Sequence, residues 1–245
     1  MRFISERIRK TYEEIGRYVY SNTLNIDNYK FIAGKYDNID EIKNAPEEGW
    51  IDFKTGDLWG EESHGWFKTS VKVPEEFAGQ TIALSFHTFL GDWDNTTNPQ
   101  FILYVNGEHI QGLDVNHQET ILTHNAVAGE VYNIDLHAHI GRIEGKKSTL
   151  HGKLVTIDEE ARKLYFNLSV PHIVATKLHE EDKRRIDMLT VLNDTINLID
   201  LRRPFTKEYN ESLKIANKYI EENFYDKMCG HEDMVATCVG HTHLD

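Results

Sequence analysis

The chain has 245 residues, enough for one large domain or two ordinary ones, and 40% of its residues are hydrophobic, as in a globular protein. Its formal net charge is -13 at pH 7 with lysine and arginine spread thinly, so neither nucleic acid nor an anionic membrane surface is expected as a partner. No apolar stretch reaches the length of a membrane span, and the N-terminal residues lack the apolar region of a signal peptide. Together with the low cysteine content, Cys229 and Cys238 alone, these features predict a cytoplasmic protein.

The chain begins with an amphipathic segment, and we predict an N-terminal helix and lead-in over residues 1–28. Apolar residues recur at helical spacing among Glu, Arg and Lys: Ile4, Ile8, Tyr12, Ile15 and Val19. We expect this helix to pack on the body of the chain, because its acidic side chains would be repelled by anionic lipid, the alternative partner.

Residues 29–175 change to the period-two pattern of β-strands. Alternation of apolar and polar residues predicts strands at 66–73, 82–86, 101–105 and 132–136. Asn106-Gly107 follows the third of these and is a strong hairpin signal, because both residues tolerate positive φ. Residues 150–157 and 164–170 flank a polar turn at 158–162 and are predicted as a further hairpin. Many short strands without a long helix between them favour an antiparallel jelly-roll-like β-sandwich.

All four tryptophans fall in the first half of this region, at positions 50, 59, 66 and 93. Indole faces stack well on sugar rings, so Trp59, Trp66 and Trp93 are candidates for a carbohydrate-binding surface. The interpretation that we prefer is burial in the core and loops. His137 and His139 would share one strand face, but without a carboxylate at ligand spacing we interpret them as core or surface histidines.

Residues 176–228 return to helical spacing and are predicted as a helical linker. One helix extends from about residue 178 to 201 and ends before Pro204, which cannot continue it. A second helix follows over residues 209–224, with Thr206 as its N-cap. The two form a C-terminal helical hairpin.

The last segment, residues 229–245, carries the most informative motif. A short apolar run at 234–239 is typical of a strand buried on both faces of a parallel sheet, as in a barrel. Because side chains two apart on a strand point the same way, His241, His243 and Asp245 would project together from its C-terminal end, where barrel enzymes place their chemistry. Imidazole and carboxylate are good zinc ligands, so this is half of a metal site; the alternative is a pair of hydrogen-bonded strand-end histidines.

This terminal segment, Val239-Gly240-His241-Thr242-His243-Leu244-Asp245, resembles the start of the catalytic barrel in family 38 glycoside hydrolases, the zinc-dependent α-mannosidases. The segments Leu58-Trp59-Gly60, His64-Gly65-Trp66-Phe67 and Gln111-Gly112-Leu113 resemble the N-terminal β-domain of the cytosolic and vacuolar-type members, so the resemblance covers essentially the whole chain.

The resemblance implies that His243 and Asp245 bind Zn²⁺, while His241 matches a motif position outside the ligand set. It further implies a retaining mechanism on terminal α-mannosides of a mannose-containing oligosaccharide. The family's nucleophilic Asp and its remaining His ligand lie far downstream of the motif, so we expect the isolated chain to be inactive. The fold expected is mainly β, a jelly-roll-like sandwich with flanking helices and the first strand of a truncated (β/α) barrel.

Two other functions stay open. Amidohydrolase-type barrels also begin with a His-x-His at the end of their first strand, where a metal-bound water attacks an amide or ester. The sandwich could instead be a carbohydrate-binding module with the terminal histidines incidental, or serve structure and assembly, including formation of a homo-oligomer.

Overall fold

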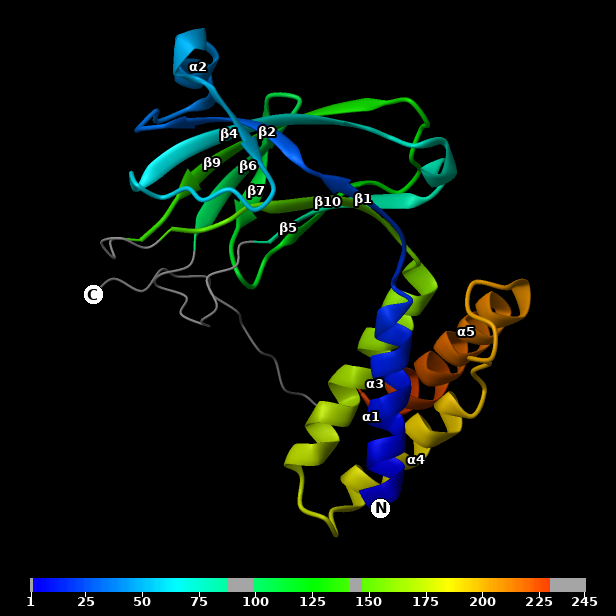
Figure 1. The fold of residues 1–245 in the computed structure, drawn as a ribbon. Helices are drawn as coiled ribbons and strands as arrows, with labels where there is room; N and C mark the ends of the chain where they lie inside the picture. The colour runs from blue at the N-terminus through cyan, green and yellow to red at the C-terminus, as the bar shows by residue number, and fades with distance from the viewer. Residues whose placement is uncertain (1, 88–98, 142–146, 230–245) are drawn as a thin grey trace. The chain divides into compact units, whose positions relative to one another are not determined.

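The computed structural model of the protein describes residues 2–87, 99–141 and 147–229 (Figure 1). The chain divides into two compact units. One comprises Tyr20–Asp158, and the other combines Met1–Val19 with Glu159–Asp245. The first unit is a β-sandwich and the second is helical.

The β-sandwich consists of two antiparallel sheets. The four-stranded sheet has the order β1(Tyr20–Ile26), β10(His151–Ile157), β5(Thr81–His87), β8(Glu119–Thr123). The six-stranded sheet has the order β3(Ile51–Lys54), β2(Asn28–Ala33), β4(His64–Lys72), β9(Val131–His139), β6(Gln100–Val105), β7(Glu108–Leu113). The short helix α2(Ile39–Lys43) lies between β2 and β3 in the sequence. This architecture confirms the mainly β, jelly-roll-like fold expected from the period-two pattern.

The core of the sandwich lies between the two sheets and takes alternate residues from each. Leu84 and Leu154 come from the four-stranded sheet, while Phe67, Leu103 and Leu136 come from the other, and none is more than 1% exposed. Alternation places these side chains on one face of each strand, so both sheets bury their apolar faces against each other.

The predicted hairpin at Asn106-Gly107 is confirmed. Both residues have positive φ, 52° and 84°, and they join β6 to β7. Asn106 Oδ1 also accepts a hydrogen bond from the Asn133 amide, which ties the turn to the neighbouring strand β9.

The predicted hairpin at 150–170 is wrong in its second half. β10 ends at Ile157, and the helix α3(Glu159–Lys177) occupies the residues predicted as a turn and a strand. Glu159 and Glu160 lie in the first turn of this helix, where carboxylates stabilise the N-terminal dipole. The run at 164–170 was mistaken for a strand because α3 carries apolar residues on its exposed face as well as its buried one, which hides the helical period.

The bounds of the sandwich differ from the predicted 29–175 accordingly. β1, which pairs with β10, begins at Tyr20 inside the segment predicted as helix and lead-in. At the other end, the unit stops at Asp158 because the following residues form α3.

The helical unit packs the N-terminal helix against three helices from the second half of the chain. It contains α1(Arg2–Arg17), α3, α4(Lys183–Ile196) and α5(Lys207–Ile220), followed by a π-helical turn at Glu221–Tyr225 and the short α6(Asp226–Met228). Ile8 and Ile15 of α1 are fully buried, which confirms that its apolar face packs on the chain itself. Thr206 is the N-cap of α5, as predicted, and its Oγ1 accepts a hydrogen bond from the Tyr209 amide.

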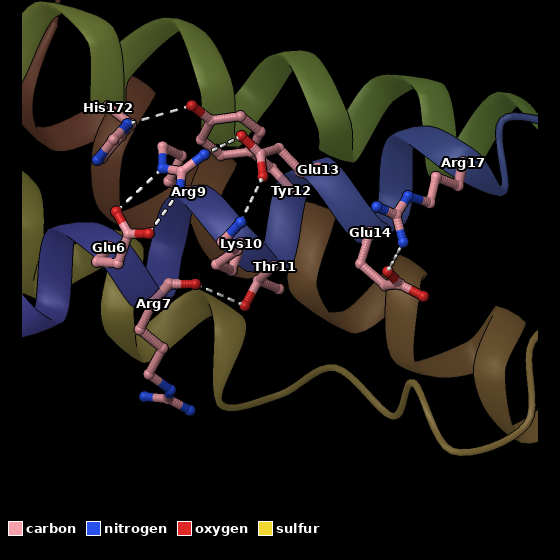
Figure 2. A network of polar contacts seen from close by, with 10 residues as sticks. All are labelled: Glu6, Arg7, Arg9, Lys10, Thr11, Tyr12, Glu13, Glu14, Arg17 and His172. Atoms are coloured by element: carbon pink, nitrogen blue, oxygen red, sulfur yellow. Dashed lines mark hydrogen bonds and ion pairs between the residues drawn. The ribbon is translucent and has the colours of Figure 1, made fainter.

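The polar face of α1 carries ion pairs along the helix (Figure 2). Arg9 pairs with both Glu6 and Glu13, and Arg17 pairs with Glu14 at 2.9 Å. The Arg7 side chain instead bonds to another helical segment. Its guanidinium donates hydrogen bonds to Asn193 Oδ1 of α4 and to Asn197 Oδ1 at the C-cap of α4. None of the helices in the described ranges has the length and apolar character that a bilayer crossing requires.

Candidate functional site

The predicted zinc ligands lie outside the described residues, as do the apolar run at 234–239 that precedes them, His241, and Trp93. Within residues 2–87, 99–141 and 147–229, no group of three or more His, Cys, Asp or Glu side chains is arranged to hold a metal ion. The zinc site therefore stays a prediction from the sequence.

Trp59 lies in the core between the sheets, whereas Trp66 lies in a second buried cluster with Ile32 and Ile42. They are 2% and 0% exposed, and Trp59 packs edge-on against Phe67 at a ring-centroid distance of 5.3 Å. Trp66 stacks on His137 at 4.6 Å with the two ring planes 4° apart, and its indole N–H donates to the Tyr36 carbonyl. No indole face of either residue is open to a sugar ring, so these two positions follow the preferred interpretation of burial and are not part of a carbohydrate-binding surface.

Three histidines meet on the outer face of the six-stranded sheet beside Trp66. His64 of β4 lies opposite His139 of β9 in the register, with ring centroids 4.6 Å apart, and His137 lies 5.8 Å from His64. Burial lowers the pKa of His64 and of His137, so both imidazoles are held in the neutral form. The His64 ring is tilted by 33° to that of His137 and by 39° to that of His139, so the three rings pack against one another without parallel stacking.

A polar groove lies on the outer face of the four-stranded sheet, with a volume of about 330 Å³. Its floor is built by cross-strand neighbours. Lys153 of β10 pairs with Ser85 of β5, and Ser85 pairs with Glu119 of β8. The adjacent row sets Thr23 of β1 beside Val155 of β10. Because Leu154 between Lys153 and Val155 points into the core, alternation directs these lining side chains outward.

Hydrogen bonds fix several lining groups. Tyr20 Oη donates to Glu119 Oε2 at 2.6 Å, a contact that spans the two central strands of the sheet. Ser85 Oγ lies 2.9 Å from His87 Nε2, and the Gln118 side chain also hydrogen-bonds to His87. Burial, and secondarily the charge of the nearby Lys153, lower the pKa of His87, so its imidazole is neutral at pH 7.

The sequence reasoning missed this groove. The signal available was the outward set of polar residues on each strand, but a strand's pattern does not say which other strands lie beside it. Lys153 and Glu119 are far apart in the sequence, and only the pairing of β10 and β8 with β5 places them on one surface.

The fold and surface therefore define a jelly-roll β-sandwich protein with an attached helical unit. A family model described as "Alpha-mannosidase, jelly roll domain" matches residues 32–174. The chain belongs to this α-mannosidase family.

Individual relatives are more distant. The chain is 22% identical over 224 residues to "Alpha-mannosidase G" of Dictyostelium discoideum, a match that covers 83% of this chain and 19% of the relative. This chain thus spans about a fifth of the length of that relative.

Solved structures similar to this chain include the β-glucuronidase of Ruminococcus gnavus. Its complex with D-glucuronic acid has a TM-score of 0.39 and 12% identity over 56% of this chain and 30% of that one. The apo structure of the same enzyme has a TM-score of 0.38, with 12% identity over 56% of this chain and 29% of that one. Similarity at this level carries no argument about activity.

Proposed function

We propose that this chain is the N-terminal part of a retaining, zinc-dependent α-mannosidase that hydrolyses terminal α-mannosides of mannose-containing oligosaccharides. The observation that carries the proposal is the match of the α-mannosidase jelly-roll family to residues 32–174. The family match also argues against the amidohydrolase-type alternative, which shares only the His-x-His of the terminal motif. The low cysteine content supports a cytoplasmic location as part of the same proposal.

In this proposal His243 and Asp245 supply two of the zinc ligands. The imidazole and carboxylate donor set suits zinc, and two ligands on one strand are preorganised for it. When bound, zinc supplies a Lewis acid and a template for vicinal hydroxyls of the sugar. A retaining mechanism also needs a nucleophilic carboxylate and a carboxylic acid for the leaving oxygen, and neither is assigned to a residue of this chain. We therefore expect the 245 residues alone to be inactive.

The first experiment is to sequence the DNA that follows the codon for Asp245 in all three frames. We expect it to encode several hundred further residues, with additional Asp and His residues that complete the zinc site. A stop codon with nothing barrel-like in any frame would refute the mannosidase proposal.

The second experiment uses the longer reading frame. Its product should hydrolyse p-nitrophenyl α-D-mannopyranoside and contain about one zinc per catalytic site by elemental analysis. His243→Ala and Asp245→Asn should each lower the affinity for zinc at least tenfold. The matched control His117→Ala, at an exposed histidine of the sandwich, should bind zinc as the parent protein does. Zinc retention in both ligand variants would show that the assignment of the site is wrong.

A further inference from the structure

We propose that the groove on the four-stranded sheet, lined by Tyr20, Lys153, Glu119 and Gln118, binds a neutral saccharide of one or two rings. The inference rests on the geometry of the sandwich unit and stands whether or not the chain is part of a mannosidase. It places sugar recognition on a surface different from the tryptophans that the sequence suggested.

The size and shape of the groove suit a small ligand. Its volume of about 330 Å³ is at the lower end of the range for small-molecule sites. The floor is rigid, because Lys153, Val155 and Ser85 belong to the two central strands of the sheet. Val115, Asn116 and Gln118 of the loop before β8 also line the groove, as does Tyr20 at the start of β1. Little reorganisation is therefore needed for binding.

The charges in the groove balance. The lining includes one ammonium group, on Lys153, and one carboxylate, on Glu119, and the lowered pKa of His87 favours its neutral imidazole. The main chain of Lys153 pairs with β1 and β5, while its ammonium group has no ion pair with another side chain in the described ranges. A phosphate or other dianion would meet a single cation beside a carboxylate, which disfavours it.

The remaining polar lining groups can each donate and accept hydrogen bonds. Thr23 and Ser85 offer hydroxyls, and Asn116 and Gln118 offer amides. Each sugar hydroxyl both donates and accepts, so a row of vicinal hydroxyls matches such a surface better than a ligand with one polar group would. Tyr20 is 47% exposed as a residue, and its ring is the aromatic group of the groove on which the C–H side of a pyranose would pack. Its hydroxyl is held by Glu119, which fixes the ring position.

The test is a titration of the full chain, labelled with ¹⁵N, with methyl α-D-mannopyranoside, methyl β-D-glucopyranoside and mannose 6-phosphate, with EDTA present. Chemical-shift changes should appear for the amides of β10, β5 and residues 115–119. We expect dissociation constants of about 0.1–10 mM for at least one neutral glycoside, the affinity that a few hydrogen bonds and one stacked ring provide. The phosphorylated sugar should bind no more tightly.

Two variants test the assignment of the groove. Lys153→Met keeps the length of the side chain but removes its charge and donors, and Asn116→Ala changes an exposed loop amide, so neither should prevent folding. Each should weaken binding by about tenfold, the effect of losing a well-placed hydrogen bond. The matched controls are Lys30→Met on the other sheet and Asn125→Ala in the loop after β8, which should bind as the parent chain does.

Each outcome decides the proposal. Binding that responds to Lys153→Met and Asn116→Ala but not to the controls supports it. The absence of shifts with any neutral glycoside at about 20 mM, or shifts that both groove variants leave unchanged, would overturn it. Tighter binding of mannose 6-phosphate than of the neutral glycosides would also overturn it, because the ligand would then be an anion. None of these outcomes depends on zinc or on hydrolysis, so they are independent of the test of the mannosidase proposal.

Discussion

Replacement of Gly152 by alanine should destabilise the sandwich by a predictable amount. Gly152 lies on the central strand β10, opposite Phe86 on one side and Ile26 on the other. A Cβ atom at this position would lie 2.3 Å from Tyr29 Oη and 2.8 Å from Phe86 Cε1. Both aromatic side chains are 3% exposed, so neither can swing into solvent to relieve the overlap. Overpacking of a rigid core by one methyl group costs about 1–3 kcal/mol.

The free energy of unfolding should be measured in urea with tryptophan fluorescence as the probe. All four tryptophans lie in the segment that forms the sandwich, so the signal reports on that unit. At about 2–4 °C per kcal/mol, a loss of about 1–3 kcal/mol should lower the melting temperature of Gly152→Ala by roughly 2–12 °C.

Gly112→Ala is the matched control. Gly112 lies on the edge strand β7, and the nearest atom to its new Cβ would be the Phe101 carbonyl oxygen at 3.9 Å, an ordinary contact. This variant should change stability by less than about 0.5 kcal/mol. Equal stabilities of the two variants would refute the reasoning, because the close packing at Gly152 would then have no energetic consequence.

Three further predictions concern the helical unit. Arg7→Ala removes the two hydrogen bonds from α1 to the α4 segment and should lower the free energy of unfolding in urea by about 0.5–1 kcal/mol. Arg17→Ala breaks an ion pair within α1 only and should lower it by less. Thr206→Ala removes the α5 N-cap and should cost about 1 kcal/mol, with Thr190→Ala, an exposed mid-helix threonine, as a near-neutral control. Burial lowers the pKa of His172, so its neutral form stabilises the folded state above the unfolded pKa of about 6.5, and this contribution is lost as the pH falls below that value. Stability between pH 7.5 and 5.5 should therefore decline less in His172→Gln than in the parent chain, and equal declines would contradict this.

The sequence alone determined the elements whose signals are local. Period-two alternation identified the strands of the core, Asn106-Gly107 identified the hairpin between β6 and β7, and Thr206 identified the start of α5. Each of these features depends on residues close together in the chain, where side-chain direction and backbone preference are fixed by the immediate neighbours. The terminal motif with His243 and Asp245 belongs here too, and it remains a prediction from the sequence.

Tertiary structure decided what depends on distant residues. The run at 164–170 could be a strand or a helix by its own pattern, and packing against α1, α4 and α5 made it part of α3. Trp59 and Trp66 could face solvent or be buried, and both are buried: Trp59 packs against Phe67 in the core, and Trp66 stacks on His137 on the other face of the same sheet. The groove exists because β5 lies between β10 and β8, which sets Lys153 and Glu119 on one outward face. A single strand fixes the side to which each residue points, whereas the neighbours it meets are set by the register of the whole sheet.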